Sequence, residues 1–167
     1  MLNKMLTLAS CMMLFTVTAL VYAAGSGVPA PIQSVMTPYL QIHDALAKDS
    51  MDGVSAAASA LGKAAQSDKM FPSELGQEAQ TLAQAKDLGT ARDAFKPLSE
   101  TLIKAIGNNH GTYVEVYCPM AKAHWLQTGT TVSNPYFGAS MSTCGSIVGG
   151  KAAPAATTCP MGGACGN

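Results

Sequence analysis

Sulfur-bearing side chains and an imidazole gather in one stretch of this sequence, residues 113 to 145. The stretch holds two of the five cysteines and the only tryptophan. Thiolate and thioether sulfurs are soft donors that select soft ions such as Cu(I), and imidazole also binds copper. The candidate metal ligands in this stretch are Cys118, Met120, His124, Met141 and Cys144.

Cys118 is followed directly by Pro119, a residue favoured at the first position of a helix. The sequence therefore predicts a short helix over 119–127 with Cys118 as its N-cap, where the helix dipole favours thiolate. On that helix Met120 and His124 are four residues apart and would share one face.

A second segment must approach the first if the ligands are to meet. Met141 and Cys144 are three residues apart, so they would share a face if this segment is helical. The connecting loop contains Asn134-Pro135, which keeps Asn134 out of the helical region, and Gly138, which can adopt a positive φ. Tyr136 and Phe137 can anchor the loop on the body of the protein.

The C-terminal segment repeats the first motif. Residues 149–167 are poor in bulky apolar side chains and predict a disordered tail that cannot form a core. Cys-Pro-Met occurs again at Cys159-Pro160-Met161, and Cys165 follows. Cys159, Met161 and Cys165 are therefore further candidate ligands, although the two cysteines could equally close a small disulfide loop.

For each candidate metal ligand there is also a purely structural interpretation. Cysteines of an exported protein commonly form disulfides, so Cys118 and Cys144 can be either a structural disulfide or a reduced or switchable metal-binding pair. Methionine is a common gap filler in cores. We expect Trp125 to anchor the core, His43 to be a packed histidine on a helix face, and His110 to lie in a turn.

The N-terminus indicates export. Residues 1–23 have a charge at Lys4, an apolar run and a small-x-Ala site before Ala23, as in a secretory signal peptide. Residues 24–35 are expected to be a flexible leader. A lipoprotein modified at Cys11 and an uncleaved membrane anchor are the alternatives, and no other apolar stretch is long enough to span a membrane.

Composition and motifs exclude several functions. The formal net charge is zero and only 12% of residues are charged, which gives no electrostatic basis for nucleic-acid binding. The sequence has no nucleophile–base–acid pattern, no phosphate loop and no haem motif. We therefore expect neither an enzyme nor an organic cofactor.

Hydrophobic periodicity predicts four helices before the sulfur-rich stretch. The first begins at Thr37-Pro38, and the second runs from an Asp49-Ser50 cap to about Ala65. The third spans Ser73 to about Leu88. The fourth starts at Thr90, contains Pro97 and ends at Gly107. We predict an all-α, antiparallel four-helix bundle over 36–148 with a Cys/Met-containing C-terminal extension, in which Tyr113 to Cys118 is extended.

The sequence resembles a family of small helical domains, DUF3347. The resemblance covers roughly 36 to 147 and rests on several short motifs in order: Tyr39-Leu40-Gln41-Ile42, Arg92…Phe95…Leu98-Ser99, Tyr117-Cys118-Pro119-Met120-Ala121, Trp125-Leu126-Gln127, Asn134-Pro135-Tyr136-Phe137-Gly138 and Met141…Cys144-Gly145. Such domains occur alone in exported bacterial proteins and at the C-terminus of periplasmic adaptor subunits of copper and silver efflux systems. The resemblance implies a periplasmic, metal-related role with Cys118, Met120, Met141 and Cys144 as candidate positions.

Two functions follow as hypotheses. The first is a periplasmic Cu(I)/Ag(I)-binding protein, a chaperone or sequestering protein linked to efflux, with a periplasmic efflux component as its partner. The second is a disulfide-stapled helical interaction module of the cell envelope that binds no metal.

Overall fold

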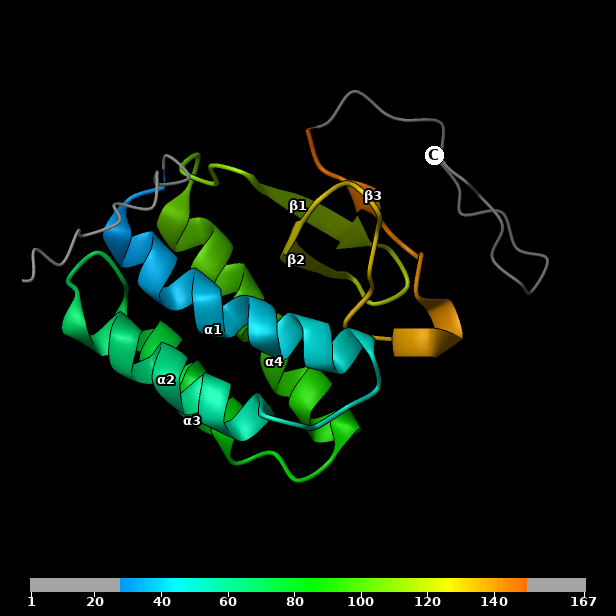
Figure 1. The fold of residues 1–167 in the computed structure, drawn as a ribbon, viewed down its shortest axis with the longest axis horizontal. Coiled ribbons are helices and arrows are strands. Elements are labelled where there is room, and N and C mark those ends of the chain that lie inside the picture. Colours follow the sequence, from blue (N-terminus) through cyan, green and yellow to red (C-terminus); the bar gives the residue numbers. More distant parts are fainter. Residues whose placement is uncertain (1–27, 150–167) are drawn as a thin grey trace, which may run out of the picture.

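Four helices precede a small antiparallel sheet in this protein (Figure 1). The structure, a computed structural model, describes residues 28–149. The helices are α1 (Ala30–Ala47), α2 (Val54–Ser67), α3 (Ser73–Ala83) and α4 (Leu88–Ile106). After them come β1 (Tyr113–Cys118), β2 (Ala123–Thr128), the 3₁₀ helix η1 (Gly138–Met141) and β3 (Ser146–Ile147). The four predicted helices are present, but the all-α prediction missed the sheet.

Successive helices pack against one another and run in opposite directions, and α4 returns to α1 (Figure 1). The faces that meet are apolar, because each helix buries residues spaced three or four apart. Small residues allow close approach between α2 and α3, where a Cβ added to Gly62 would lie 3.4 Å from the Ala79 Cβ. The helices thus form a bundle, and the sheet packs against α4 and α1 through β2.

Helix α1 begins earlier than the sequence predicted. Thr37-Pro38 was expected to start it, yet the helix begins at Ala30, within the segment expected to be a flexible leader, and Pro38 lies in its interior. The reason is burial, since the extra turns place three fully buried side chains against the core: Ile32, Val35 and Met36. Burying such side chains offsets the cost of about 3 kcal/mol for an interior proline.

The boundaries of the next three helices also differ from the predicted ones. Asp49 has a positive φ of 55° and does not cap α2, which starts at Val54 after Gly53. Helix α3 stops at Ala83. Helix α4 starts at Leu88, because the Asp87 side chain accepts the Thr90 N–H at 2.8 Å and so provides the N-cap.

The predicted helix over 119–127 is wrong. Strands β1 and β2 form an antiparallel hairpin in which Cys118 pairs with Ala123 and Tyr117 pairs with His124. Strand β1 is central in the order β2-β1-β3. Pairing with β1 supplies a hydrogen-bond ladder that a nine-residue isolated helix could not match, and Pro119 lies in the turn between the strands. The extended segment predicted at Tyr113 to Cys118 is confirmed as β1.

Side chains from elsewhere in the fold cover the outer edge of β2. The Leu126 N–H donates to the Tyr39 hydroxyl at 3.1 Å, and the His124 N–H donates to the Glu100 carboxylate at 3.2 Å. The Tyr136 hydroxyl donates to the His124 carbonyl at 2.6 Å. Burial raises the pKa of both tyrosines, so each hydroxyl stays protonated across the physiological range. An edge strand is thereby protected from pairing with other chains.

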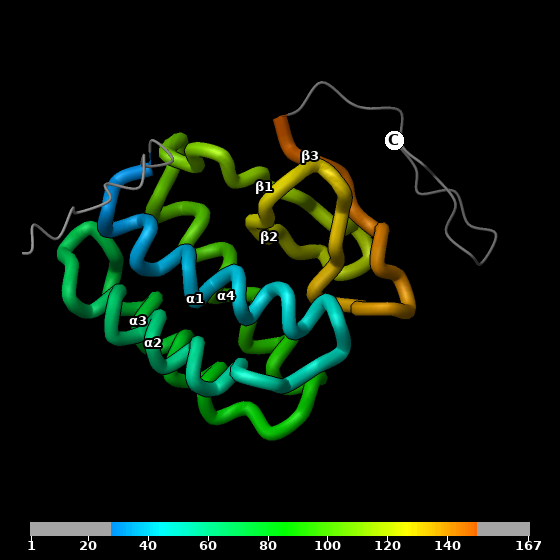
Figure 2. The backbone as a smooth tube through the Cα atoms, viewed as in Figure 1, coloured from blue at the N-terminus to red at the C-terminus, as the bar shows by residue number. Residues whose placement is uncertain are grey.

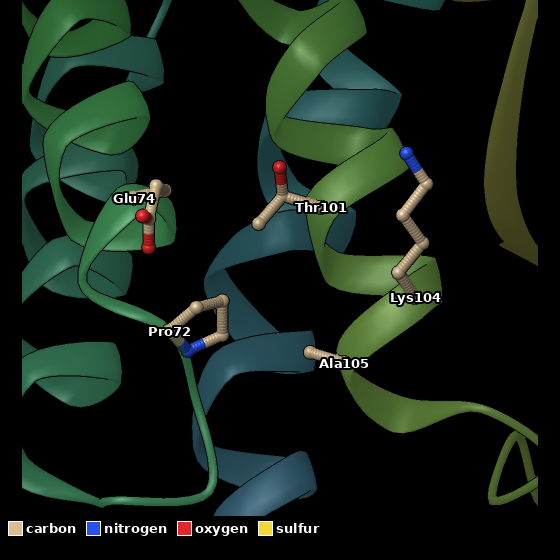
Figure 3. A pocket seen from close by; sticks show the side chains of 5 residues that line it. All are labelled: Pro72, Glu74, Thr101, Lys104 and Ala105. Atoms are coloured by element: carbon tan, nitrogen blue, oxygen red, sulfur yellow. The ribbon is translucent and has the colours of Figure 1, made fainter.

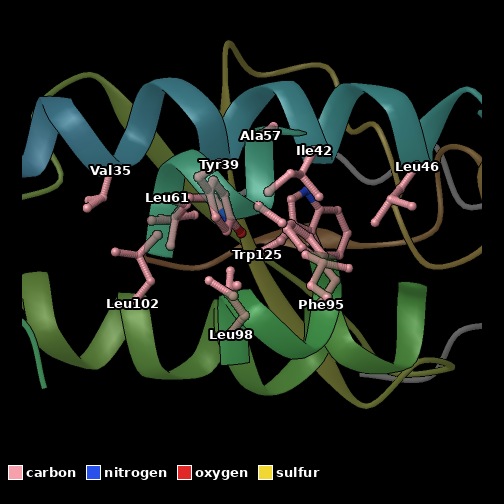
Figure 4. Close-up of a cluster of buried hydrophobic side chains, with 14 of the residues drawn as sticks. Val35, Tyr39, Ile42, Leu46, Ala57, Leu61, Phe95, Leu98, Leu102 and Trp125 are labelled. Carbon is pink, nitrogen blue, oxygen red and sulfur yellow. The ribbon is translucent and has the colours of Figure 1, made fainter. Parts of the chain in front are cut away.

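Trp125 joins the sheet to the helices. Its side chain is fully buried, and Figure 4 shows it among Tyr39, Ile42 and Phe95 between α1 and α4. The ring of Tyr136 meets it edge-on with centroids 5.8 Å apart. The expectation that Trp125 anchors the core is confirmed.

The predicted signal peptide, residues 1–23, and all but the first residue of the predicted tail, 149–167, lie outside the described residues. Among residues 28–149, none of the helices has the length and apolar character needed to cross a membrane.

Candidate metal centre

The structure brings together two cysteines that are 26 residues apart in the sequence. Cys118 ends β1, and Cys144 lies between η1 and β3. Their Sγ atoms are 3.2 Å apart. Figure 2 shows how this happens: after β2 the chain passes the C-terminal end of α1 before it returns to the sheet.

The sulfur separation lies between two chemical states. A disulfide needs about 2.05 Å between the sulfurs. A metal ion bound by two thiolates at about 2.3 Å each places them up to roughly 4.6 Å apart. From 3.2 Å, either state is reached by a movement of about 1 Å.

Both sulfurs lie beneath the surface, with Cys118 fully buried and Cys144 8% exposed. Cys118 is not a helix N-cap as predicted, so no helix dipole acts on its sulfur. The backbone N–H of Ala121, in the turn after β1, instead points at the Cys118 Sγ at 3.4 Å.

The loop that carries Cys144 is pressed against the sheet. A Cβ added to Gly145, whose φ is +147°, would lie 2.8 Å from the Trp125 ring and 3.0 Å from Val116. Trp125 and Val116 are paired residues on the same face of the sheet as Cys118. Glycine at this position therefore lets the loop approach closely enough for the two sulfurs to meet.

Asn134 ties the start of the same loop to its end. Its side-chain amide donates to the Cys144 carbonyl at 2.6 Å, and its backbone N–H donates to the Ser142 carbonyl at 2.8 Å. Its side-chain oxygen accepts the N–H groups of Tyr136 and Phe137 at 2.8 and 3.1 Å. Asn134 is fully buried, so these bonds are shielded from water.

Arg92 of α4 fixes the loop to the helices. Its guanidinium donates to the carbonyls of Pro135 and Leu46 at 2.9 and 2.8 Å and pairs with the Asp49 carboxylate at 2.5 Å. The other oxygen of Asp49 accepts the Ala139 N–H at 2.9 Å. The hydrogen bond from Arg92 is the main reason that the pKa of Asp49 lies below its usual value.

The two candidate methionines differ in exposure. Met120 lies in the β1–β2 turn, two residues from Cys118, and its side chain is 60% exposed. Met141 ends η1 and is partly buried against the core. A gap-filling role therefore describes Met141 but not Met120.

His124 does not face the cysteine pair. It is opposite Tyr117 in the hairpin, and successive strand residues point to opposite faces, so it lies on the other side of the sheet from Cys118. Its Nδ1 lies 2.6 Å from the Glu115 carboxylate, and its ring packs on that of Tyr117 with centroids 4.6 Å apart. The helical face that was expected to join it to Met120 does not exist.

The other two histidines have local roles. His43 is 2% exposed; its Nδ1 lies 2.9 Å from the Asp44 carboxylate and its Nε2 lies 2.9 Å from the Ser133 carbonyl. It is a packed histidine, as expected. The carbonyl of His110 accepts the Tyr113 N–H at the start of β1.

The described residues, 28–149, contain no group of three or more His, Cys, Asp or Glu side chains able to hold a metal. What they offer is a dithiol with a thioether two residues away along the chain. The predicted ligands Cys159, Met161 and Cys165 lie outside the described residues.

A depression of about 380 Å³ lies elsewhere, between α3 and α4 (Figure 3). It is lined by Pro72, Glu74, Thr101, Lys104 and Ala105 and contains no sulfur or imidazole. Thr101 also donates to Glu78 at 3.0 Å, and burial raises the pKa of that carboxyl. We assign this depression no part in the cysteine site.

Sequence reasoning missed the residues that hold the loop. Asn134 was expected to leave the helical region before Pro135, and Asp49 was expected to cap the second helix. Arg92 entered only as part of a motif shared with the family, with no role in the loop. The available signal was an asparagine before proline, a pattern typical of side-chain-capped turns. Its partner at Cys144 is ten residues away and could not be read from local pattern.

Residues 35–112 match DUF3347. The family is described as a protein of unknown function, and the match supports the family that the sequence motifs suggested. The DUF3347 match covers α2, α3, α4 and most of α1, and it ends before β1 and both cysteines. Comparison with curated proteins and with solved structures found no match. The resemblance to efflux adaptor domains remains a prediction.

Proposed function

We propose that this chain is an exported protein that binds Cu(I) or Ag(I) and serves as a chaperone or sequestering protein linked to metal efflux. The observation that supports it best is the 3.2 Å approach of the Cys118 and Cys144 sulfurs from two separate segments. Two thiolates are a sufficient ligand set for a soft ion, whereas hard cations prefer oxygen. In this proposal the protein binds metal and catalyses no reaction.

Uptake requires the two sulfurs to part by about 1 Å. Strand β1 is paired on both sides, so Cys118 is the fixed partner. Cys144 follows a short 3₁₀ helix and is the more exposed of the two. The movement therefore falls on the segment between η1 and β3.

Met120 is the proposed third donor. An exposed thioether beside a buried dithiol can meet an arriving ion before the thiolates do, and a thioether binds Cu(I) without losing a proton. Met141, which is partly buried, is a further donor on the Cys144 side.

The remaining parts of the proposal rest on sequence. The second Cys-Pro-Met motif, with Cys159, Met161 and Cys165, would capture ions or pass them on. Export to the periplasm rests on residues 1–23, and an efflux component as partner rests on the resemblance.

The test is a competition titration of Cu(I) or Ag(I) against a chromogenic chelator of known affinity, with the full chain fully reduced. Variants C118S/C144S and C159S/C165S separate the two cysteine pairs. We expect C118S/C144S to lose a tight site that C159S/C165S retains. Equal affinity of the wild type and C118S/C144S would refute the proposal.

A disulfide-stapled interaction module that binds no metal is the second candidate. The observation that favours it is burial, because a fully buried Cys118 in contact with Cys144 is well placed to form a disulfide in an oxidising compartment. Alkylation of the exported protein under denaturing conditions, followed by peptide mapping, measures how much of the pair is oxidised. A complete Cys118–Cys144 disulfide, with no metal uptake after mild reduction, would support this candidate over the first.

A further inference from the structure

Asn134 makes five hydrogen bonds within the loop between β2 and β3; one is from the Gly138 N–H to its carbonyl at 3.1 Å, and the other four shape the loop. Two of them, from Tyr136 and Phe137 to its side-chain oxygen, form a turn next to Asn134 itself. The other two reach across the loop to the carbonyls of Ser142 and Cys144. The bond to Cys144 is short, 2.6 Å, and it is made by a side chain with no exposed surface.

The hydrogen bond between Asn134 and Cys144 restrains the backbone of Cys144, the less firmly held of the two cysteines. Cys118 is held by its strand, whereas the backbone of Cys144 lies between a short 3₁₀ helix and a two-residue strand. Its N–H donates to the Met141 carbonyl at 3.1 Å, and its carbonyl accepts the Asn134 amide. The Asn134 side-chain amide therefore restrains Cys144 from a position ten residues earlier in the loop.

We infer that Asn134 is a positioning residue that holds the Cys144 sulfur within bonding range of the Cys118 sulfur. It acts through the backbone of Cys144 and touches neither sulfur. By preorganising the pair, it raises the effective concentration of one thiol at the other. Its importance for metal uptake rests on the proposed function, whereas its effect on the dithiol itself does not.

A plainer role would be general support of the fold, and Gln127 provides the comparison. Gln127 is also a buried amide, 1% exposed, and it lies near the end of β2, just before the same loop begins. It accepts the Trp125 Nε1–H at 3.0 Å and donates to the Thr131 carbonyl at 2.7 Å. It also donates to the Gly129 carbonyl at 3.4 Å and accepts the Ser133 N–H at 3.1 Å, and none of these side-chain hydrogen bonds involves either cysteine. The same chemical change at both amides therefore separates positioning of the cysteines from general stability.

The test measures the equilibrium between the protein dithiol and dithiothreitol. Oxidised dithiothreitol and the dithiol give the Cys118–Cys144 disulfide and reduced dithiothreitol, with two electrons and two protons passing to the reagent. The full chain carries C11S, C159S and C165S in every variant, so Cys118 and Cys144 are the two thiols that remain and one protein disulfide is counted. Peptide mapping assigns the bond.

Asn134→Asp keeps an oxygen for Tyr136 and Phe137 but places a carboxyl oxygen against the Cys144 carbonyl. Asn134→Ser keeps a hydroxyl acceptor and is too short to reach Cys144. Gln127→Glu is the matched control. We expect both Asn134 variants to lower the equilibrium constant for disulfide formation about three- to tenfold, the effect of one net hydrogen bond. Gln127→Glu should change it less than about twofold, although it lowers the urea midpoint.

The inference is overturned if the Asn134 variants stay within about twofold of wild type, or if Gln127→Glu shifts the constant as much as they do. If Asn134→Asp does not unfold cooperatively, Asn134→Ser decides alone. A wild type that binds no Ag(I), with the Asn134 effect intact, refutes the proposed function and leaves this inference standing.

Discussion

The guanidinium of Arg92 and the carboxylate of Asp49 lie 2.5 Å apart, and each also binds the loop that ends at Cys144. Arg92 donates to the Pro135 carbonyl, and Asp49 accepts the Ala139 N–H. One ion pair thereby connects α4, the segment before α2 and the loop that carries Cys144. The Arg92 side chain is 17% exposed and the Asp49 side chain 39% exposed, so the pair is shielded from solvent mainly on the arginine side.

Arg92→Lys should destabilise the protein although it keeps the charge. A lysine ammonium cannot reproduce the planar fork that reaches Pro135, Leu46 and Asp49 together. We expect the free energy of unfolding to fall by about 1–3 kcal/mol, measured by urea denaturation. Lys104→Ala, at an exposed position of the same helix, should change it by less than about 0.5 kcal/mol. Equal effects of the two changes would contradict the role given to Arg92.

Asp49 should contribute to loss of stability in acid. Its pKa is lowered from 3.8, mainly by the hydrogen bond from Arg92 and then by the Ala139 N–H. A carboxyl with a lowered pKa in the folded state stabilises the protein above its unfolded pKa. That stability is lost as the pH falls through the lowered value. Asp49→Asn should therefore flatten the dependence of the unfolding free energy on pH below about 4.

Asp87→Asn is the matched control for the acid experiment. The hydrogen bonds from Thr90 to Asp87 also lower the pKa of that carboxyl, so its replacement should flatten the pH profile too. Asp87 caps α4: its side chain accepts the N–H and the hydroxyl of Thr90, and its carbonyl accepts the Ala91 N–H at 2.9 Å. We expect Asp49→Asn alone to lower the dithiothreitol equilibrium constant of the cysteine pair. A similar loss in Asp87→Asn would show that the pair responds only to overall stability.

Gly138→Ala should be more harmful than Gly129→Ala, although both glycines lie in the same loop with positive φ, +53° and +73°. A Cβ at Gly138 would overlap the Asp49 carboxylate and lie 2.5 Å from the Arg92 guanidinium, whereas at Gly129 it meets nothing within 4 Å. We expect about 1–2 kcal/mol of backbone strain at Gly129 and roughly 3 kcal/mol or more at Gly138. Thermal or urea unfolding measures both losses of stability. Equal losses would mean that the Arg92 and Asp49 side chains move aside at little cost.

Met120→Leu should weaken Cu(I) or Ag(I) binding without changing stability. The side chain is 60% exposed, so leucine removes the thioether at little cost in packing. Met70→Leu is the control, since Met70 is 40% exposed in the α2–α3 connection, at the opposite end of the molecule from the β1–β2 turn (Figure 1). We expect a several-fold loss of affinity for Met120→Leu in the chelator competition and none for Met70→Leu. Unchanged affinity in Met120→Leu would remove the thioether from the site.

Much of the helical bundle could be predicted from the sequence, because its signals are local. Apolar residues at a period near 3.6 indicated all four helices, and Gly107 was correctly expected to end the last. Errors fell where a tertiary contact opposed a local signal. Pro38 was taken as a helix start, but the burial of Ile32, Val35 and Met36 carried α1 through it.

The site was predicted in part for the same reason. Residue types alone singled out Cys118 and Cys144. The short helix expected after Cys118 was wrong, because Pro119 serves a turn of the hairpin equally well and strand pairing is not visible in a single segment. That error also placed His124 beside Met120, whereas the register of the hairpin puts it with Glu115 on the other face of the sheet.

The sequence by itself determined which side chains have soft-metal chemistry, because thiol and thioether reactivity belongs to the residue type. It also determined the helical scaffold, because helix periodicity is a property of a continuous segment. Only the tertiary structure decided which of those side chains meet. The contact between Cys118 and Cys144 depends on strand register, on a close approach at Gly145 and on the bonds of Asn134, Arg92 and Asp49. These interactions join residues far apart in the chain, so they exist only once the chain has folded.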